Sequence, residues 1–191
     1  MIEELIKKWS NPGYTTANEH RLILNLIDKL KTSYPIVEIG TWEGRTTAMM
    51  AEFCSLKSLE NKIIGIDTFQ VFDYYGEIKL APDKTITEKN ILPFSNVSLI
   101  EGFSNDEKVI KQIDKVSLLF IDGNHSYSAV QSDITNWFPK VQEYCLFHDY
   151  NLPDISAAIR KSGLKIDKII DTIAVIKKDE NINNNPNKEK K

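Results

Sequence analysis

Short apolar segments that alternate with segments of helical periodicity constrain the fold of this chain more than any other feature. Five strand-like segments cover residues 35–40, 62–67, 96–102, 116–122 and 143–149. Helical patterns occupy the intervals, over residues 1–10, 46–56, 128–138 and 155–163 among others. Strands that alternate with helices predict an α/β fold, in which a parallel sheet is covered on both faces and the crossovers are right-handed. The continuous apolar run VSLLFI fits a strand buried on both faces.

The C-terminal part of the chain closes this sheet differently. Residues 164–171 and 172–178 have the pattern of two adjacent strands with no room for a crossover helix, so at least one of them runs antiparallel. We therefore predict a doubly wound, mostly parallel sheet that ends in an antiparallel hairpin. Residues 35–178 form the domain and follow an N-terminal helical segment at 1–34. The tail at 179–191 has almost no apolar residues, and we expect it to be disordered.

Two segments carry weaker signals. Thr15 or Thr16 is placed to cap the second helix, and Glu19 lies three residues after Thr16, as a capping box requires. Residues 70–95 hold several aromatic and charged side chains without a clear period, and we interpret them as a lid or a wall of the acceptor site. In the helix at 128–138, we interpret Asp133 and Trp137 as a helix-surface residue and a packing residue.

Composition limits the classes of partner. The formal net charge of −3 provides no basic surface for phosphates, so we expect no nucleic-acid partner. No run approaches the ~20 apolar residues of a membrane span, and the N-terminus lacks a signal-peptide core. We expect a cytoplasmic protein with no membrane partner, whose cysteines, Cys54 and Cys145, are reduced and buried. Assembly into a homo-oligomer stays open.

A glycine loop and a distant acid carry the first chemical signal. In VEIGTWEGRTT, Gly40 and Gly44 separate a strand that contains Glu38 from the following helix. The next strand ends in Asp67, where a carboxylate is placed to accept hydrogen bonds from the ribose hydroxyls of a nucleoside cofactor. The dinucleotide fingerprint is absent, because Trp42 stands where its second glycine belongs. A plain tight turn that needs glycine is the alternative.

These segments, with IIGIDTF, IEGFS, FIDGNHSYSAVQSDI and FHDYN, resemble the class I S-adenosylmethionine-dependent methyltransferases. Among these, they are most similar to the small-domain group that contains the macrocin and other sugar O-methyltransferases. The resemblance covers residues 35–177 and implies a Rossmann-like, seven-stranded sheet. It implies S-adenosyl-L-methionine as cofactor and a small-molecule hydroxyl as acceptor, on a sugar or natural product. The cofactor-binding residues that it implies are Glu38, Gly40, Thr41, Gly44, Asp67, Thr68, Ser104 and Asp122.

The second chemical signal is the ending of two strands, at Asp122 and at His148–Asp149. The resemblance implies that Asp122, His148 and Asp149 hold a divalent metal ion, Mg²⁺ or Mn²⁺. An imidazole at the middle position favours Mn²⁺ or another softer ion over Mg²⁺. A site with only two protein ligands, or one that binds no metal, is the alternative. A hydroxyl acceptor must lose its proton, and the position that resembles the family's base is Asn124, which accepts no proton. We expect His125 to accept the proton in place of Asn124. The predicted catalytic residues are then Asp122, His125 and Asp149.

His125 has two alternative roles, capping the following helix or orienting Asp122. Two alternative functions also remain open at this stage. One is a non-catalytic module on the same fold that binds the cofactor or the glycan machinery. The other is an NAD-dependent oxidoreductase, against which the missing second glycine and the antiparallel hairpin argue.

Overall fold

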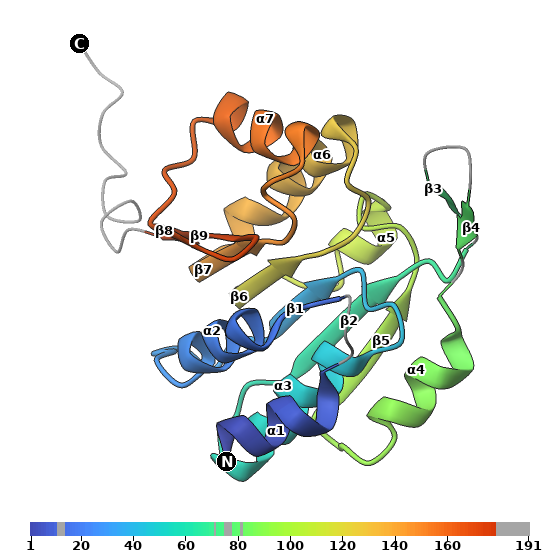
Figure 1. Cartoon of the computed structure of the whole chain (residues 1–191), viewed down its shortest axis with the longest axis vertical. Helices are drawn as coiled ribbons and strands as arrows, with labels where there is room; N and C mark the ends of the chain where they lie inside the picture. Colours follow the sequence, from blue (N-terminus) through green and yellow to red (C-terminus); the bar gives the residue numbers. More distant parts are fainter. Residues whose placement is uncertain (11–13, 71, 75–77, 81, 179–191) are drawn as a thin grey trace.

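The computed structural model describes residues 1–178 except 11–13, 71, 75–77 and 81. Its centre is a seven-stranded sheet of order β5-β2-β1-β6-β7-β9-β8 (Figure 1). All neighbouring pairs are parallel except β7–β9 and β8–β9, which confirms the mostly parallel sheet with a closing antiparallel hairpin. The strands are β1 (Ile36–Ile39), β2 (Ile63–Asp67), β5 (Val97–Glu101), β6 (Val116–Ile121), β7 (Val141–Phe147), β8 (Lys168–Ile170) and β9 (Ile173–Lys177).

Helices cover both faces of the sheet (Figure 1). On one face lie α1 (Ile2–Trp9), α2 (Ala17–Ile27) and α3 (Arg45–Leu56). On the other face lie α5 (Glu107–Ile110), α6 (Tyr127–Trp137) and α7 (Pro153–Ser162).

β6 shows why its sequence is apolar throughout. Leu118 and Phe120 pack under the helices of the first face, whereas Leu119 and Ile121 pack under those of the second. Successive side chains of a strand point to opposite faces, so a strand in the middle of a covered sheet needs apolar residues at every position.

The helix ends follow their local chemistry. Thr16 caps α2, and both hydrogen bonds of the capping box with Glu19 are present. Gly163 ends α7 in the left-handed region, at φ 74°, a conformation that glycine commonly supplies at helix C-termini. α6 continues into a 3-10 turn at Phe138–Lys140.

The segment after β2 contains elements that the sequence did not predict. A small antiparallel hairpin joins β3 (Phe72–Tyr74) to β4 (Ile78–Leu80), and α4 (Lys84–Ile91) follows. Asp83 caps α4, and Thr87 Oγ1 donates to the carbonyl of Trp42, so this helix lies against the glycine loop. The tail at 179–191 lies outside the described residues.

β7 also differs from its prediction at both ends. The strand begins at Val141 and ends at Phe147, before His148, instead of covering 143–149. A register shift between Val116 and Leu118 accommodates the additional pairing at its start. Within the described part of the chain, no helix is both long enough and apolar enough to span a membrane.

Candidate active site

A cavity of about 990 Å³ opens at the carboxyl ends of the parallel strands. This is the edge where open α/β sheets bind ligands. Nearly all predicted site residues line it: Glu38, Gly40, Thr41, Asp67, Thr68, Ser104, Asp122, His125, His148 and Asp149. Gly44 is not among the lining residues. It starts α3 at φ 70°, and a Cβ there would lie 2.8 Å from Thr87 Cγ2, so this glycine shapes the turn against α4.

Gly40 brings the end of β1 against the end of β6. Its φ is +88°, and an added Cβ would lie 2.3 Å from the carbonyl oxygen of Asp122 and 2.7 Å from Gly123 Cα. Both neighbours are backbone atoms, so they have little freedom to move away. The loop after β1 and the strand end that carries Asp122 therefore form one rigid wall of the cavity.

The Asp67 carboxylate organises the glycine loop. Its Oδ2 accepts the backbone N–H groups of Thr41 and Trp42, both at 2.9 Å, and its Oδ1 accepts that of Phe69 at 3.0 Å. The Thr41 hydroxyl also lies 3.4 Å from Oδ2, so the acceptor capacity that remains is chiefly on Oδ1. Asp67 is thus held in place before any ligand arrives.

Glu38 is a buried carboxyl beside the same loop. Its side chain is 2 % exposed and accepts a hydrogen bond from the Thr47 hydroxyl. Burial raises the pKa of Glu38 well above its usual range, and the nearby charges of Asp122 and Asp67 raise it further. The hydrogen bond from Thr47 lowers this pKa but does not outweigh the burial. A cationic ligand group beside Glu38 would favour its ionised form.

Ser104 connects the cavity wall to α6. Its hydroxyl donates to Asp133 Oδ1 at 2.5 Å, and its carbonyl accepts the Trp137 indole N–H at 2.8 Å. Trp137 is a packing residue as predicted, but Asp133 is buried, so its interpretation as a helix-surface residue is wrong. Burial raises the pKa of Asp133 to about 6, partly opposed by the Ser104 bond. Asp133 lies three residues after Val130 and four before Trp137, on the buried stripe of α6.

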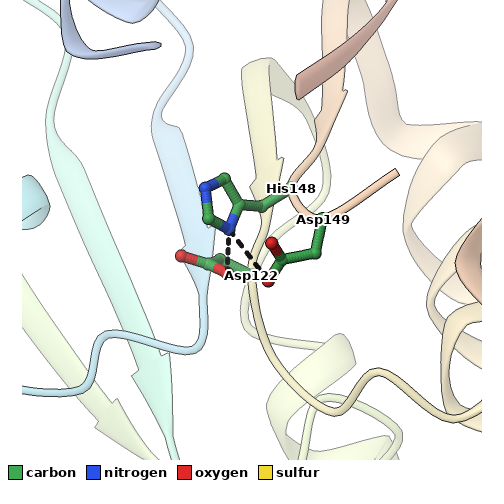
Figure 2. A group of neighbouring side chains, drawn as sticks. All are labelled: Asp122, His148 and Asp149. Atoms are coloured by element: carbon green, nitrogen blue, oxygen red, sulfur yellow. Dashed lines mark ion pairs between the residues drawn. The ribbon is translucent and has the colours of Figure 1, made fainter. Parts of the chain in front are cut away.

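Asp122, His148 and Asp149 converge at the ends of β6 and β7 (Figure 2). The His148 Nδ1 atom lies 3.0 Å from Asp122 Oδ1 and 3.2 Å from Asp149 Oδ2. One atom from each residue lies within 4.8 Å of the others. Asp149 adopts a left-handed backbone conformation, at φ 52°, which is uncommon for a residue other than glycine. The turn after β7 holds Asp149 in this conformation, and the Asp149 carboxylate faces His148.

This donor set fits a divalent cation. The His148 Nδ1 atom is buried and makes no regular hydrogen bond, although two carboxylate oxygens face it. Two ligands at right angles on an octahedral ion, each at ~2.1 Å from it, are ~3.0 Å apart, close to these separations. Two carboxylates and one imidazole suit Mn²⁺ better than Ca²⁺.

In the absence of a cation, the carboxylates favour protonated His148. Burial opposes the charged imidazolium, but the charge of Asp122 and the contacts with Asp149 and Glu19 outweigh it and raise the pKa of His148 to about 12. The same contact with His148 and the bonds from Thr172 hold the pKa of Glu19 below its usual range despite burial. A metal ion would take the place of the proton on Nδ1.

His125 lies beside the cluster without belonging to it. Its Nε2 atom is 3.5 Å from Asp149 Oδ2 and 3.9 Å from Asp122 Oδ1, and its side chain is 29 % exposed. Ser126, not His125, caps α6, so the capping alternative for His125 is wrong. Asn124 accepts the backbone N–H of Ser126 at 2.9 Å and stabilises the turn.

The N-terminal segment also reaches this cavity. Tyr14, Thr16, Glu19 and His20 line it, together with Thr172 of the closing hairpin. Glu19 was explained by its capping box, and no local pattern relates it to His148, 129 residues away. Only the structure shows that the Glu19 carboxylate is fully buried, which its place in a capping box does not require.

Comparisons with known proteins agree with this geometry. A family model described as a methyltransferase domain matches residues 37–150. Uncharacterized protein R132 of Acanthamoeba polyphaga mimivirus is 30% identical over 153 residues, which are 73% of this chain and 62% of that protein. The chain therefore spans less than two thirds of this relative.

Two solved structures share the fold. The O-methyltransferase NovP is 18% identical with a TM-score of 0.69, over 85% of this chain and 81% of that one. The MycE methyltransferase of the mycinamycin pathway, in complex with Mg, S-adenosylhomocysteine and mycinamycin VI, is 17% identical with a TM-score of 0.59, over 93% and 53%. The family match and the shared fold confirm the resemblance that the sequence motifs indicated: this chain belongs to the methyltransferase-domain family of class I S-adenosylmethionine-dependent methyltransferases.

Proposed function

We propose that this protein transfers the methyl group of S-adenosylmethionine to a hydroxyl group of a small molecule, with a divalent metal ion at Asp122, His148 and Asp149. One observation carries the proposal. Asp67, which is placed to bind the ribose of the cofactor, lines the same cavity as the cluster of Asp122, His148 and Asp149. All of these residues lie at the carboxyl ends of parallel strands of one sheet. A cofactor and a metal-held acceptor would therefore meet in that cavity.

The cofactor lies along the wall formed by β1 and β2. Asp67 accepts the ribose hydroxyls chiefly on Oδ1, where the loop leaves an acceptor position free. Thr68 and Ser104 border the adenine. Glu38 and Thr41 lie along the methionine part, where the cationic amine of the cofactor stabilises the ionised form of Glu38. The seven carboxyl groups of the described cavity lining also suit the positive sulfonium: Glu19, Glu38, Glu43, Asp67, Asp122, Asp149 and Asp154.

The acceptor lies at the cluster. Asp122, His148 and Asp149 would hold a divalent ion there, which would supply Lewis-acid activation of an acceptor hydroxyl. His125 takes the hydroxyl proton on Nε2, the acceptor oxygen forms a bond to the methyl carbon, and the bond from that carbon to sulfur breaks to leave neutral S-adenosylhomocysteine. Asp149, 3.5 Å from His125 Nε2, stabilises the imidazolium that results. The cavity walls align donor and acceptor for the in-line displacement.

The charge of the cavity lining favours an uncharged acceptor. Arg45 is the guanidinium among the described lining residues, and it pairs with Glu43 at 3.1 Å. The proposed divalent ion would offset the charges of Asp122 and Asp149, but a phosphate or carboxylate on the acceptor would still face Asp154 with no free guanidinium of the described lining to bind it. A neutral sugar or natural-product hydroxyl meets no such repulsion.

Methyl transfer tests the proposal directly. Purified protein is incubated with S-adenosylmethionine labelled in its methyl group and fractionated small-molecule extracts, with and without EDTA and then with Mn²⁺ restored. We expect label in a neutral fraction, loss of transfer in EDTA and recovery with Mn²⁺. Transfer that is unchanged in EDTA contradicts the metal part. Tight binding of S-adenosylhomocysteine without transfer into any extract favours a non-catalytic cofactor-binding module.

A further inference from the structure

Glu19 joins three distant parts of the chain. Its carboxylate is fully buried, although α2 begins at the rim of the cavity. Oε1 accepts the N–H and the hydroxyl of Thr172, at 2.8 and 2.6 Å. Oε2 accepts the N–H of Thr16 at 2.7 Å and lies 3.4 Å from His148 Nε2. Both oxygens are therefore engaged, and one of them faces the imidazole.

Capping explains only one of these contacts. A capping box needs the Glu19 side chain to reach the Thr16 N–H, and it is formed as readily by glutamine. It requires neither complete burial nor contact with the hairpin turn. A buried carboxylate is costly unless donors surround it, and here the hairpin and His148 supply them.

The two ring nitrogens of His148 have different surroundings. Nε2 faces Glu19, whereas Nδ1 faces Asp122 and Asp149. In metal sites, a ligating histidine usually donates its other ring N–H to a carboxylate or carbonyl, which fixes the tautomer and the orientation of the ring. Glu19 stands where such a partner belongs.

We infer that Glu19 is a positioning residue for His148. The Glu19 carboxylate holds the imidazole proton on Nε2 and thereby directs the Nδ1 lone pair toward the metal position. The inference rests on the metal site of the proposed function. It assigns a role to the closing hairpin as well, because Thr172 holds the carboxylate with its N–H and its hydroxyl. A separate hydrogen bond, from the Thr16 hydroxyl to Asp171 at 2.6 Å, connects the start of α2 to the same turn.

The Glu19→Gln variant separates this role from capping. Glutamine can keep the capping box by turning its amide oxygen toward the Thr16 N–H, but its amide N–H₂ then faces the N–H of Thr172, and the negative charge beside His148 is lost. We expect the Kd for Mn²⁺, measured by calorimetry on the full chain at constant pH, to rise about 10- to 100-fold. Thr16→Ala is the control, since it removes the cap and the Asp171 contact but leaves the carboxylate, and we expect its Kd within about twofold of the parent. Equal Mn²⁺ affinity of the parent and Glu19→Gln overturns the inference.

Nitrogen-15 NMR of the histidine rings provides a second, independent readout. The chain has three histidines, so the ring signals are few, and Zn²⁺ serves as a diamagnetic probe. We expect His148 in the Zn²⁺-bound protein to carry its proton on Nε2 and to lose this single tautomer in Glu19→Gln. A proton on Nδ1, or on both nitrogens, with Zn²⁺ bound overturns the inference. Failure of the parent to bind either metal refutes the metal site as well, whereas binding of S-adenosylhomocysteine reports separately on the methyltransferase proposal.

Discussion

Substitution of Gly40 by alanine tests whether the close contact between β1 and β6 builds the cofactor wall. The new Cβ would lie 2.3, 2.6 and 2.7 Å from three backbone atoms of Asp122 and Gly123, at φ +88°. The left-handed backbone costs a non-glycine residue about 1–2 kcal/mol, and forcing an atom into a packed region adds about 1–3 kcal/mol. We therefore expect a loss of about 2–5 kcal/mol in the free energy of unfolding.

Gly163 provides a matched control. It has a similar φ of +74°, but an added Cβ would meet no atom within 4 Å. Gly163→Ala should lose only about 1 kcal/mol. Urea denaturation gives both values, and calorimetry with S-adenosylhomocysteine should show weakened binding for Gly40→Ala alone. Equal stability and equal affinity of the two variants would refute the argument that β1 and β6 meet in a rigid contact.

The remaining predictions concern single groups. The pKa of Asp133 is about 6 in the folded protein and 3.8 ordinarily, so the folded state binds this proton more tightly than the unfolded state. The free energy of unfolding should therefore fall by about 3 kcal/mol as the pH rises through that window. Asp133→Asn should flatten this slope in melting curves recorded from pH 4 to 7, and an unchanged slope contradicts it. His125→Ala should lower kcat by about 100-fold or more and leave S-adenosylhomocysteine affinity unchanged; parental turnover would exclude His125 as the base. Thr16→Ala should cost about 1 kcal/mol of stability in urea denaturation, and no loss would argue against the cap.

Much of the fold follows from local patterns. The apolar strands, the capping box at Thr16 and the glycine at Gly163 each have a local cause, and the structure confirms them. The closing hairpin follows from the missing crossover between β8 and β9. α4 and α5 were missed because α4 has few apolar residues and α5 spans four residues, too short for a periodic signal.

The candidate site was predictable in part, because parallel strands end at one edge and bring Asp67, Asp122 and Asp149 to it. The contribution of Glu19 was not, since the contact with His148 depends on how α2 packs over the sheet. Asp133 shows a different kind of error. Its position on the stripe from Val130 to Trp137 predicts burial, but its charge favoured a surface interpretation. The hydroxyl of Ser104 meets that carboxyl in the interior.

Calorimetric titration with S-adenosylhomocysteine tests the central claim most directly. We expect the parent to bind one molecule per chain, and Asp67→Ala to bind at least about tenfold more weakly, because a carboxylate that accepts the ribose hydroxyls is lost. Glu101→Ala is the matched control, since Glu101 ends the neighbouring strand in register with Asp67 but pairs with Lys84. Its affinity should equal that of the parent. Absence of S-adenosylhomocysteine binding by the folded parent, or binding of NAD(H) in its place, would contradict the assignment of this cavity to S-adenosylmethionine.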